Sequence, residues 1–106
     1  MKVSIETIPH EAQRYATQGD WRFNADQDVL EISVSIMGDW RKEAEVAVHE
    51  LVEALLCRSR GITTKEVDDF DMTYEGDGEP GDDPQAPYHR EHKIALIAER
   101  ILELGW

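Results

Sequence analysis

The segment from about Trp40 to Arg60 constrains the fold more than any other part of the chain. Nearly every uncharged position in it is Val, Ala or Leu. At about 100° per residue these side chains surround a helix and do not form a single stripe. A helix that is apolar on all sides is buried in its protein. We therefore expect one long helix that is largely covered by the rest of the chain.

Three ionisable residues, His49, Glu50 and Glu53, lie in the middle of this predicted helix. His49 and Glu53 are one turn apart, so they project from the same face, where Val46 and Leu56 are their neighbours. An unpaired buried polar group costs on the order of several kcal/mol. The imidazole and the carboxylate therefore need a partner at this position, and a metal ion suits both.

The spacing of these residues is typical of a metal-binding helix. Ligands at positions i and i+4 place their donor atoms about one turn apart on one face, as His49 and Glu53 do. Glu50 is turned about 100° away, where it can take a proton from a metal-activated water. The pattern is that of the His-Glu-x-x-His motif with Glu53 in place of the second histidine. The sequence thus predicts Glu50 as the catalytic base.

A third ligand must come from another part of the chain. The remaining histidines are His10, His89 and His92. His92 would complete a set of two His and one Glu, which is a known ligand set of catalytic zinc. His89 lies one turn earlier and is an alternative or additional ligand, while Tyr88 and Glu91 are close enough in sequence to support the site. We expect zinc bound by His49, Glu53 and His92, with His89 as the alternative to His92.

The first third of the chain is predicted to form a small antiparallel β-meander, with one outer strand that has a face in water. Alternation of apolar and polar residues carries this prediction, and Gly, Asn and Asp punctuate it. The predicted strands are Lys2 to Ile8, Tyr15 to Thr17, Trp21 to Phe23 and Val29 to Ile36, with turns at Gln18 to Asp20 and at Asn24 to Asp28.

Helix-capping residues delimit the rest. Asp39 is suited to the N-cap of the long helix and Gly61 to its left-handed end. A capping box starting at Thr63 predicts a short helix over Thr64 to Phe70, and an acidic loop follows from Asp71 to Pro87. A final packing helix begins near Pro87. Its predicted apolar stripe consists of Ile94, Ile97, Ala98, Ile101 and Leu104. The fold class is therefore α+β.

Length and charge limit the class of protein. The 106 residues predict a single domain, 1–106. The formal net charge of -12 repels nucleic acid and anionic membranes, so neither is expected as a direct partner. No stretch is long and apolar enough for a membrane helix. The lone cysteine, Cys57, excludes an internal disulfide, is expected in the core, and suits a reducing compartment, so we predict a cytoplasmic protein.

On these residues the chain resembles a minimal zincin, which is the metallopeptidase-like fold. It is also similar to small proteins that phages and prophages encode. The resemblance covers most of the chain from Val29 onward. It implies a zinc-bound His49 and Glu53, a catalytic Glu50, and a strand, Val29 to Ile36, that holds an extended peptide by backbone hydrogen bonds. The implied activity is hydrolysis of a peptide amide in a peptide or protein substrate. The segments that carry the resemblance are His49 to Ala54, Cys57, Gly61, Phe70-Asp71, Glu79 to Pro84, Ala86 to Tyr88 and Glu91-His92.

The sequence is compatible with three other interpretations. His49 and Glu53 can form a buried pair that needs no metal. The domain can also be a non-catalytic, metal-stabilised binding or regulatory module of phage origin. Finally, Glu50 and Glu53 followed by Glu66 and Asp69 are similar to the magnesium-binding pattern of the all-α nucleotide pyrophosphohydrolases. The predicted strands argue against that last family, and it gives His49 no role. The oligomeric state is open.

Overall fold

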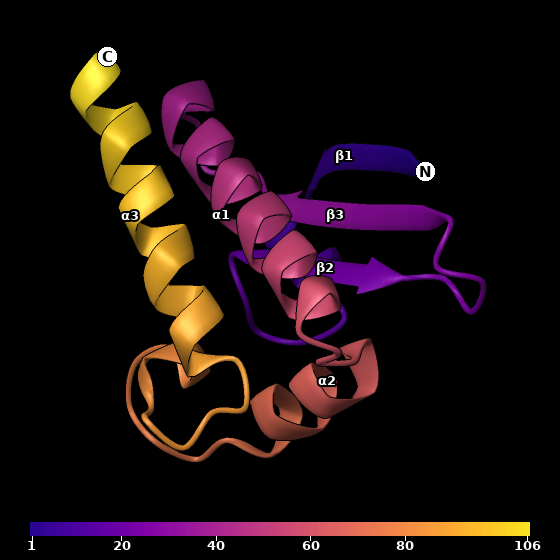
Figure 1. The fold of residues 1–106 in the computed structure, drawn as a ribbon. Helices are drawn as coiled ribbons and strands as arrows, with labels where there is room; N and C mark the ends of the chain where they lie inside the picture. Colours follow the sequence, from indigo (N-terminus) through magenta and orange to yellow (C-terminus); the bar gives the residue numbers. More distant parts are fainter.

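The computed structural model describes all residues from Met1 to Trp106. Three strands precede three α-helices, so the predicted α+β class is confirmed (Figure 1). None of the helices is both long and apolar enough to cross a membrane. The elements are β1 (Lys2–Ile8), the 3-10 turn η1 (His10–Ala12), β2 (Gly19–Phe23), β3 (Val29–Ser35), α1 (Trp40–Ser59), α2 (Thr64–Thr73), the 3-10 turn η2 (Pro80–Asp82) and α3 (His89–Gly105).

The sheet is mixed, with the strand order β1-β3-β2. β3 pairs in parallel with β1, with Ile5 opposite Ile32, and antiparallel with β2. The predicted antiparallel meander is therefore wrong in its pairing, and the predicted outer strand Val29 to Ile36 lies in the centre of the sheet. Because both edges of β3 are paired, it cannot hold a peptide by backbone hydrogen bonds. Alternation reports which side of a strand meets water and carries no information about the neighbouring strands.

The tight hairpin of the sheet joins β2 to β3. Asn24 starts the turn: its backbone N–H donates to Val29, and its side-chain oxygen accepts from the N–H groups of Asp28 and Val29. The predicted turn at Asn24 to Asp28 is thus confirmed. The predicted strand Tyr15 to Thr17 is wrong, because these residues belong to the irregular connection between β1 and β2.

Helix α1 lies across one face of the sheet (Figure 1). As predicted, Asp39 caps its start by accepting from the N–H of Arg41 at 3.0 Å, and Gly61 follows its end with a φ of 75°. Ala54 and Cys57 of α1 are completely buried, so Cys57 is a core residue as expected. The buried core consists of Trp21, Leu30, Ile32, Val34, Ala54, Cys57, Val67, Ala86 and Tyr88.

The capping box at Thr63 is present, and α2 continues to Thr73. α3 begins at His89, two residues after Pro87, and packs along α1 in the opposite direction (Figure 1). Its buried residues are Glu91, His92 and Ala95. The predicted packing stripe is wrong for its outer part, since Ile97, Ile101 and Leu104 are exposed. The face of α3 that carries His92 and Ala95 packs against α1. Ile97, Ile101 and Leu104 lie on the opposite side of the helix.

Candidate metal centre

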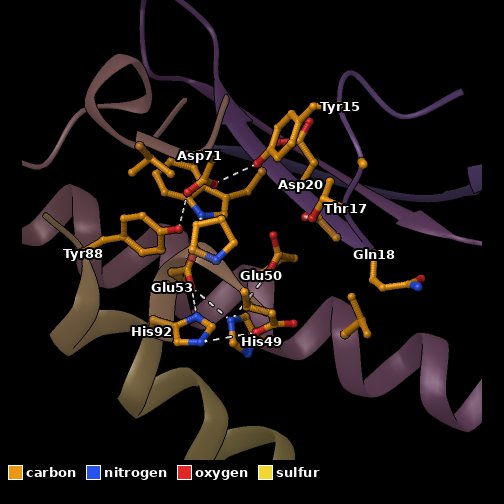
Figure 2. Close-up of a pocket in the computed structure, with 18 of the residues that line it drawn as sticks. Tyr15, Thr17, Gln18, Asp20, His49, Glu50, Glu53, Asp71, Tyr88 and His92 are labelled. Atoms are coloured by element: carbon orange, nitrogen blue, oxygen red, sulfur yellow. Dashed lines mark hydrogen bonds and ion pairs between the residues drawn. The ribbon is translucent and has the colours of Figure 1, made fainter. Parts of the chain in front are cut away.

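Three donor atoms from two adjacent helices meet in the core of the molecule. Glu53 Oε2 lies 3.0 Å from His49 Nε2 and 3.1 Å from His92 Nδ1. The three side chains are almost completely buried, and their donor atoms all lie within 4.8 Å of one another (Figure 2). α1 supplies His49 and Glu53 at the predicted i, i+4 spacing, and α3 supplies His92. The structure therefore brings together the three residues predicted as ligands.

Each of these residues also has a second polar partner. His92 Nε2 lies 2.9 Å from Asp82 Oδ1, and Glu53 Oε1 accepts from the indole N–H of Trp21 at 2.9 Å. His49 Nδ1 lies 2.5 Å from Glu99 Oε1, but out of line for a hydrogen bond, so this contact is an ion pair only. Metal-binding histidines usually direct their other nitrogen to a carboxylate or carbonyl, which orients the ring. His92 has that arrangement through Asp82, whereas Glu99 contacts His49 as an ion pair without a hydrogen bond.

Glu50 borders the same cluster and is buried next to the strand β2. Its Oε2 lies 3.8 Å from His49 Nε2, and its carboxylate has no hydrogen bond to the protein. Gly19 of β2 leaves the space for it, since a Cβ there would lie 2.7 Å from Glu50 Cγ. Burial, followed by the charge of Glu53, raises the pKa of Glu50 well above its ordinary value. A carboxylate in this position is suited to accept a proton.

Without a metal, the contacts of His49 and Glu53 favour the charged form of both side chains. Burial lowers the pKa of His49, but the hydrogen bond to Glu53 and the contact with Glu99 outweigh this effect and raise it to about 10. Burial raises the pKa of Glu53, but hydrogen bonds from His49 and His92 lower it to about 2. The pKa of His92 is also raised, against its burial, by Glu53. In the metal-free protein a protonated His49 thus faces an ionised Glu53.

Metal binding is therefore expected to depend on pH. Because the pKa of His49 is about 10 in the metal-free protein, His49 must lose its proton when a metal binds at neutral pH. Affinity should rise about tenfold per pH unit for each proton released between about pH 6 and 8. Calorimetric titration with zinc in two buffers of different protonation enthalpy measures the protons released. An affinity that is the same at both ends of this range would contradict the assignment of His49 as a ligand.

A pocket of about 110 Å³ opens beside the cluster. Tyr15 and Tyr88 line it on the side away from His49, and both contact the carboxylate of Asp71 (Figure 2). Asp71 of α2 accepts from the hydroxyl of Tyr15 at 2.9 Å and from that of Tyr88. Burial raises the pKa of Asp71 to about 6, although both phenols lower it. Tyr88 thus lines the pocket, as expected from its place in the sequence, but its hydroxyl is engaged by Asp71.

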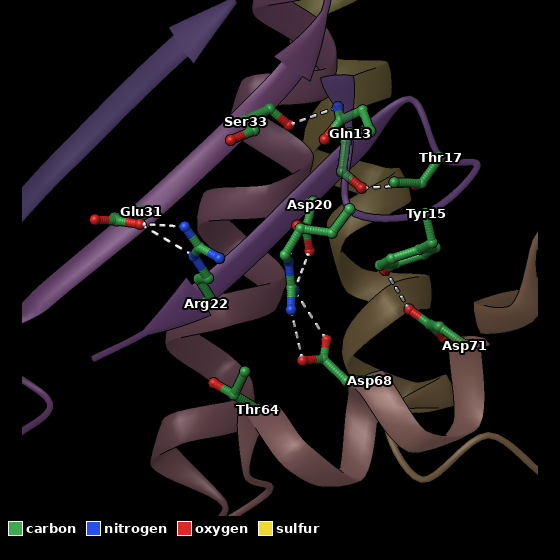
Figure 3. A network of polar contacts seen from close by, with 12 residues as sticks. Gln13, Tyr15, Thr17, Asp20, Arg22, Glu31, Ser33, Thr64, Asp68 and Asp71 are labelled. Atoms are coloured by element: carbon green, nitrogen blue, oxygen red, sulfur yellow. Dashed lines mark hydrogen bonds and ion pairs between the residues drawn. The ribbon is translucent and has the colours of Figure 1, made fainter. Parts of the chain in front are cut away.

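Arg14, in the connection between β1 and β2, binds two carboxylates, Asp20 of β2 and Asp68 of α2. Figure 3 shows how Asp20 and Asp68 lie next to each other. Arg14 donates to both oxygens of Asp20 at 2.7 and 2.8 Å, and to both oxygens of Asp68 at 3.0 and 3.1 Å. Planar, paired contacts of this kind fix geometry as well as charge. Arg14 therefore joins the β1-β2 connection to β2 and to α2, and so places the adjacent Tyr15 at the pocket.

The other candidate residues near His92 lie outside the cluster. The Nδ1 of His89 lies 2.9 Å from the carbonyl oxygen of Gly81. Glu91 is completely buried and pairs with Arg60 at 2.6 Å, away from the pocket. The structure thus places His92, and not His89, beside His49. Glu91 does not support the site.

Four carboxylates would have to converge for a nucleotide pyrophosphohydrolase site. Glu66 is instead part of the capping box, accepting from the N–H of Thr63 at 3.2 Å. Asp69 is exposed and pairs with Lys65 at 2.5 Å. Neither residue lines the pocket beside Glu50. Nothing in the arrangement of these groups favours that interpretation.

Several polar residues around the site were not anticipated from the sequence. Glu99 follows His92 by seven residues, which is two helical turns, so it lies on the same face of α3. The helical period was therefore a usable signal for Glu99. No local pattern connects Trp21, Asp82 or Tyr15 with His49, since they lie on other elements far away in the sequence.

Comparison of this chain with models of protein families, with curated proteins and with solved structures found no match. The resemblance to zincin-like proteins therefore stays a prediction. The geometry of His49, Glu50, Glu53 and His92 is the basis on which a function can be proposed.

Proposed function

We propose that this protein is a zinc-dependent hydrolase of the minimal metallopeptidase type. His49, Glu53 and His92 hold the zinc ion, and Glu50 takes the proton from the attacking water. The bond attacked is the amide of a peptide or protein substrate. The observation that carries the proposal is the convergence of three buried donor atoms, each belonging to a side chain with a second polar partner.

The residues present fit zinc. Two imidazoles and one carboxylate form a known ligand set of catalytic zinc, and three protein ligands leave a position open. Asp82 and Trp21 hydrogen-bond the other polar atoms of His92 and Glu53, as expected of oriented ligands, and Glu99 forms an ion pair with His49. When bound, zinc supplies Lewis acidity, which lowers the pKa of water and polarises a carbonyl group.

Glu50 is the group of this chain that moves a proton. Its carboxylate makes no hydrogen bond to the protein and lines the pocket beside His49. The raised pKa of Glu50 increases its basicity when ionised, so it accepts a proton from water and passes it to the leaving amine. Gly19 permits this position, because a side chain there would displace Glu50.

Metal analysis of the purified protein tests the proposal. We expect about one zinc per chain in protein purified without chelators. The His49→Ala variant should retain none, because two remaining ligands bind zinc weakly. The His89→Ala variant is the matched control and should keep its zinc, since His89 lies outside the cluster. Wild-type protein without stoichiometric zinc, or full retention by His49→Ala, would reject the site.

We also propose a phage or prophage origin and a cytoplasmic location. The origin follows from the resemblance described above. The single cysteine, Cys57, supports a reducing compartment, because it is completely buried and has no second cysteine to pair with.

A further inference from the structure

Strand β1 has one unpaired edge along its whole length. The N–H of Lys2 donates to Asp28 and the carbonyl of Ile8 accepts from Ile36, both at 2.8 Å, so these residues direct their backbone groups toward β3. Backbone groups alternate in direction along a strand. The N–H and C=O groups of Val3 and Ile5, and those of Thr7, therefore point away from the sheet.

The side chains at this edge are apolar and exposed. Val3 pairs with Leu30 and Ile5 with Ile32, so both point to the face of the sheet that α1 covers. Leu30 and Ile32 are buried, whereas Val3 is 40% and Ile5 50% exposed. β3 is the only element that packs extensively against β1, and Figure 1 shows β1 at the side of the sheet away from β2. An uncovered apolar edge strand is a template for pairing with another strand.

We propose that β1 pairs antiparallel with β1 of a second copy of this chain, about a two-fold axis through Ser4. The two sheets then form one continuous sheet of six strands. In this register Val3 lies opposite Ile5 of the second copy, and these two residues exchange backbone hydrogen bonds. The inference does not depend on the proposed hydrolase activity, because the metal cluster lies at the β2 side of α1.

Charge complementarity selects both the occupant and the register. Lys2 and Glu6 are exposed, lie on the outer face of β1, and are equidistant from Ser4. A two-fold axis at Ser4 therefore places each Lys2 opposite a Glu6 of the other copy. An axis at Val3 or at Ile5 satisfies the same backbone groups but places Ser4 opposite Lys2 or Glu6. Only the register at Ser4 forms two ion pairs, and the same strand supplies both partners.

The apolar pairs lie on the opposite face. Val3 and Ile5 of each copy pack across the new strand pair, which removes exposed apolar surface from water. Pairing through a single strand buries little surface, so the dimer is expected to dissociate in the micromolar range or above. The interface is isologous and closes, because each β1 has only one free edge.

Charge reversal tests this arrangement by sedimentation equilibrium between about 1 µM and 1 mM protein. The wild type should reach the mass of a dimer. Lys2→Glu and Glu6→Lys should each weaken the dimer about thirty-fold, because two attractive pairs become repulsive. An equimolar mixture of these two variants should associate again, since it restores two opposite-charge pairs. Lys42→Glu, an exposed reversal on α1, is the control and should leave the dimer intact.

A wild type that stays monomeric over this range would overturn the proposal, as would variants with unchanged dissociation constants or a mixture that does not associate. Species larger than a dimer would also overturn it. Circular dichroism of each variant establishes that it is folded. Ile5→Pro is a second variant: it removes an outward N–H that β3 does not use, so it should abolish the dimer while the strand signal remains.

Discussion

The Glu50→Gln variant is expected to hydrolyse peptides about 10²- to 10⁴-fold more slowly than the wild type while retaining its zinc. Glutamine has nearly the same size and fills the space beside Gly19, but it cannot accept a proton at neutral pH. Glu50 is not one of the three proposed ligands, so the metal content should not change. The expected effect is therefore on kcat, with zinc content and fold unchanged.

The measurement combines kcat on a panel of fluorogenic peptides with zinc analysis of the same samples. Glu45→Gln is the matched control: Glu45 lies on the same helix and accepts from the indole N–H of Trp106 at 2.7 Å, a bond that glutamine can keep. It should leave kcat within about twofold, as a surface substitution does. If Glu50→Gln kept the full rate, Glu50 would not be the base. If the wild type held zinc but cleaved no peptide, the protein would be a metal-stabilised binding module.

Removal of zinc is expected to lower the thermal midpoint of unfolding by about 15 to 30 °C. A ligand at about 1,000 times its Kd stabilises the folded state by about 4 kcal/mol, and for a domain of this size each kcal/mol shifts Tm by about 4–8 °C. The physical reason is that an ion in the proposed site would join α1 to α3 through His49, Glu53 and His92. Without the ion, two contacts join the helices at this point: the ion pair between His49 and Glu99, and the hydrogen bond between His92 and Glu53.

Thermal denaturation with zinc and with a chelator measures this shift. The His49→Ala variant provides the reference, because it should unfold at the same temperature under both conditions. An equal response of the variant and the wild type to chelator would place the metal elsewhere. A wild type that does not respond at all would indicate that His49, Glu53 and His92 satisfy one another without an ion.

The helices could largely be predicted because their signals are local. Asp39 and Gly61 delimit α1, and Thr63 with Glu66 forms the capping box that starts α2. A cap depends on residues within one turn of it, so it can be recognised in the sequence alone. The irregular course of Tyr15 to Thr17 was mispredicted, because short stretches with strand-like composition adopt whatever conformation their distant contacts stabilise.

The pairing of the strands had no such signal. The alternation of β3 correctly indicated buried Leu30, Ile32 and Val34, but it did not indicate that β1 would lie parallel to β3 on one side and β2 antiparallel on the other. The packing of α3 had no local signal either. Ile97 and Ile101 predicted that their face of the helix would be buried, but the face with His92 and Ala95 is the buried one.

For the site, the sequence by itself determined the pair His49 and Glu53, because their spacing of one helical turn places both donors on one face. It also determined that Glu50 would lie beside them. Only the tertiary structure decided that His92 completes the cluster, since a contact across 39 residues depends on how α3 packs against α1. The tertiary structure also decided which residues contact these side chains, since the partners come from separate elements. Backbone periodicity relates residues within one element, and only packing relates one element to another. These partners are Trp21 of β2, Asp82 of η2 and Glu99 of α3.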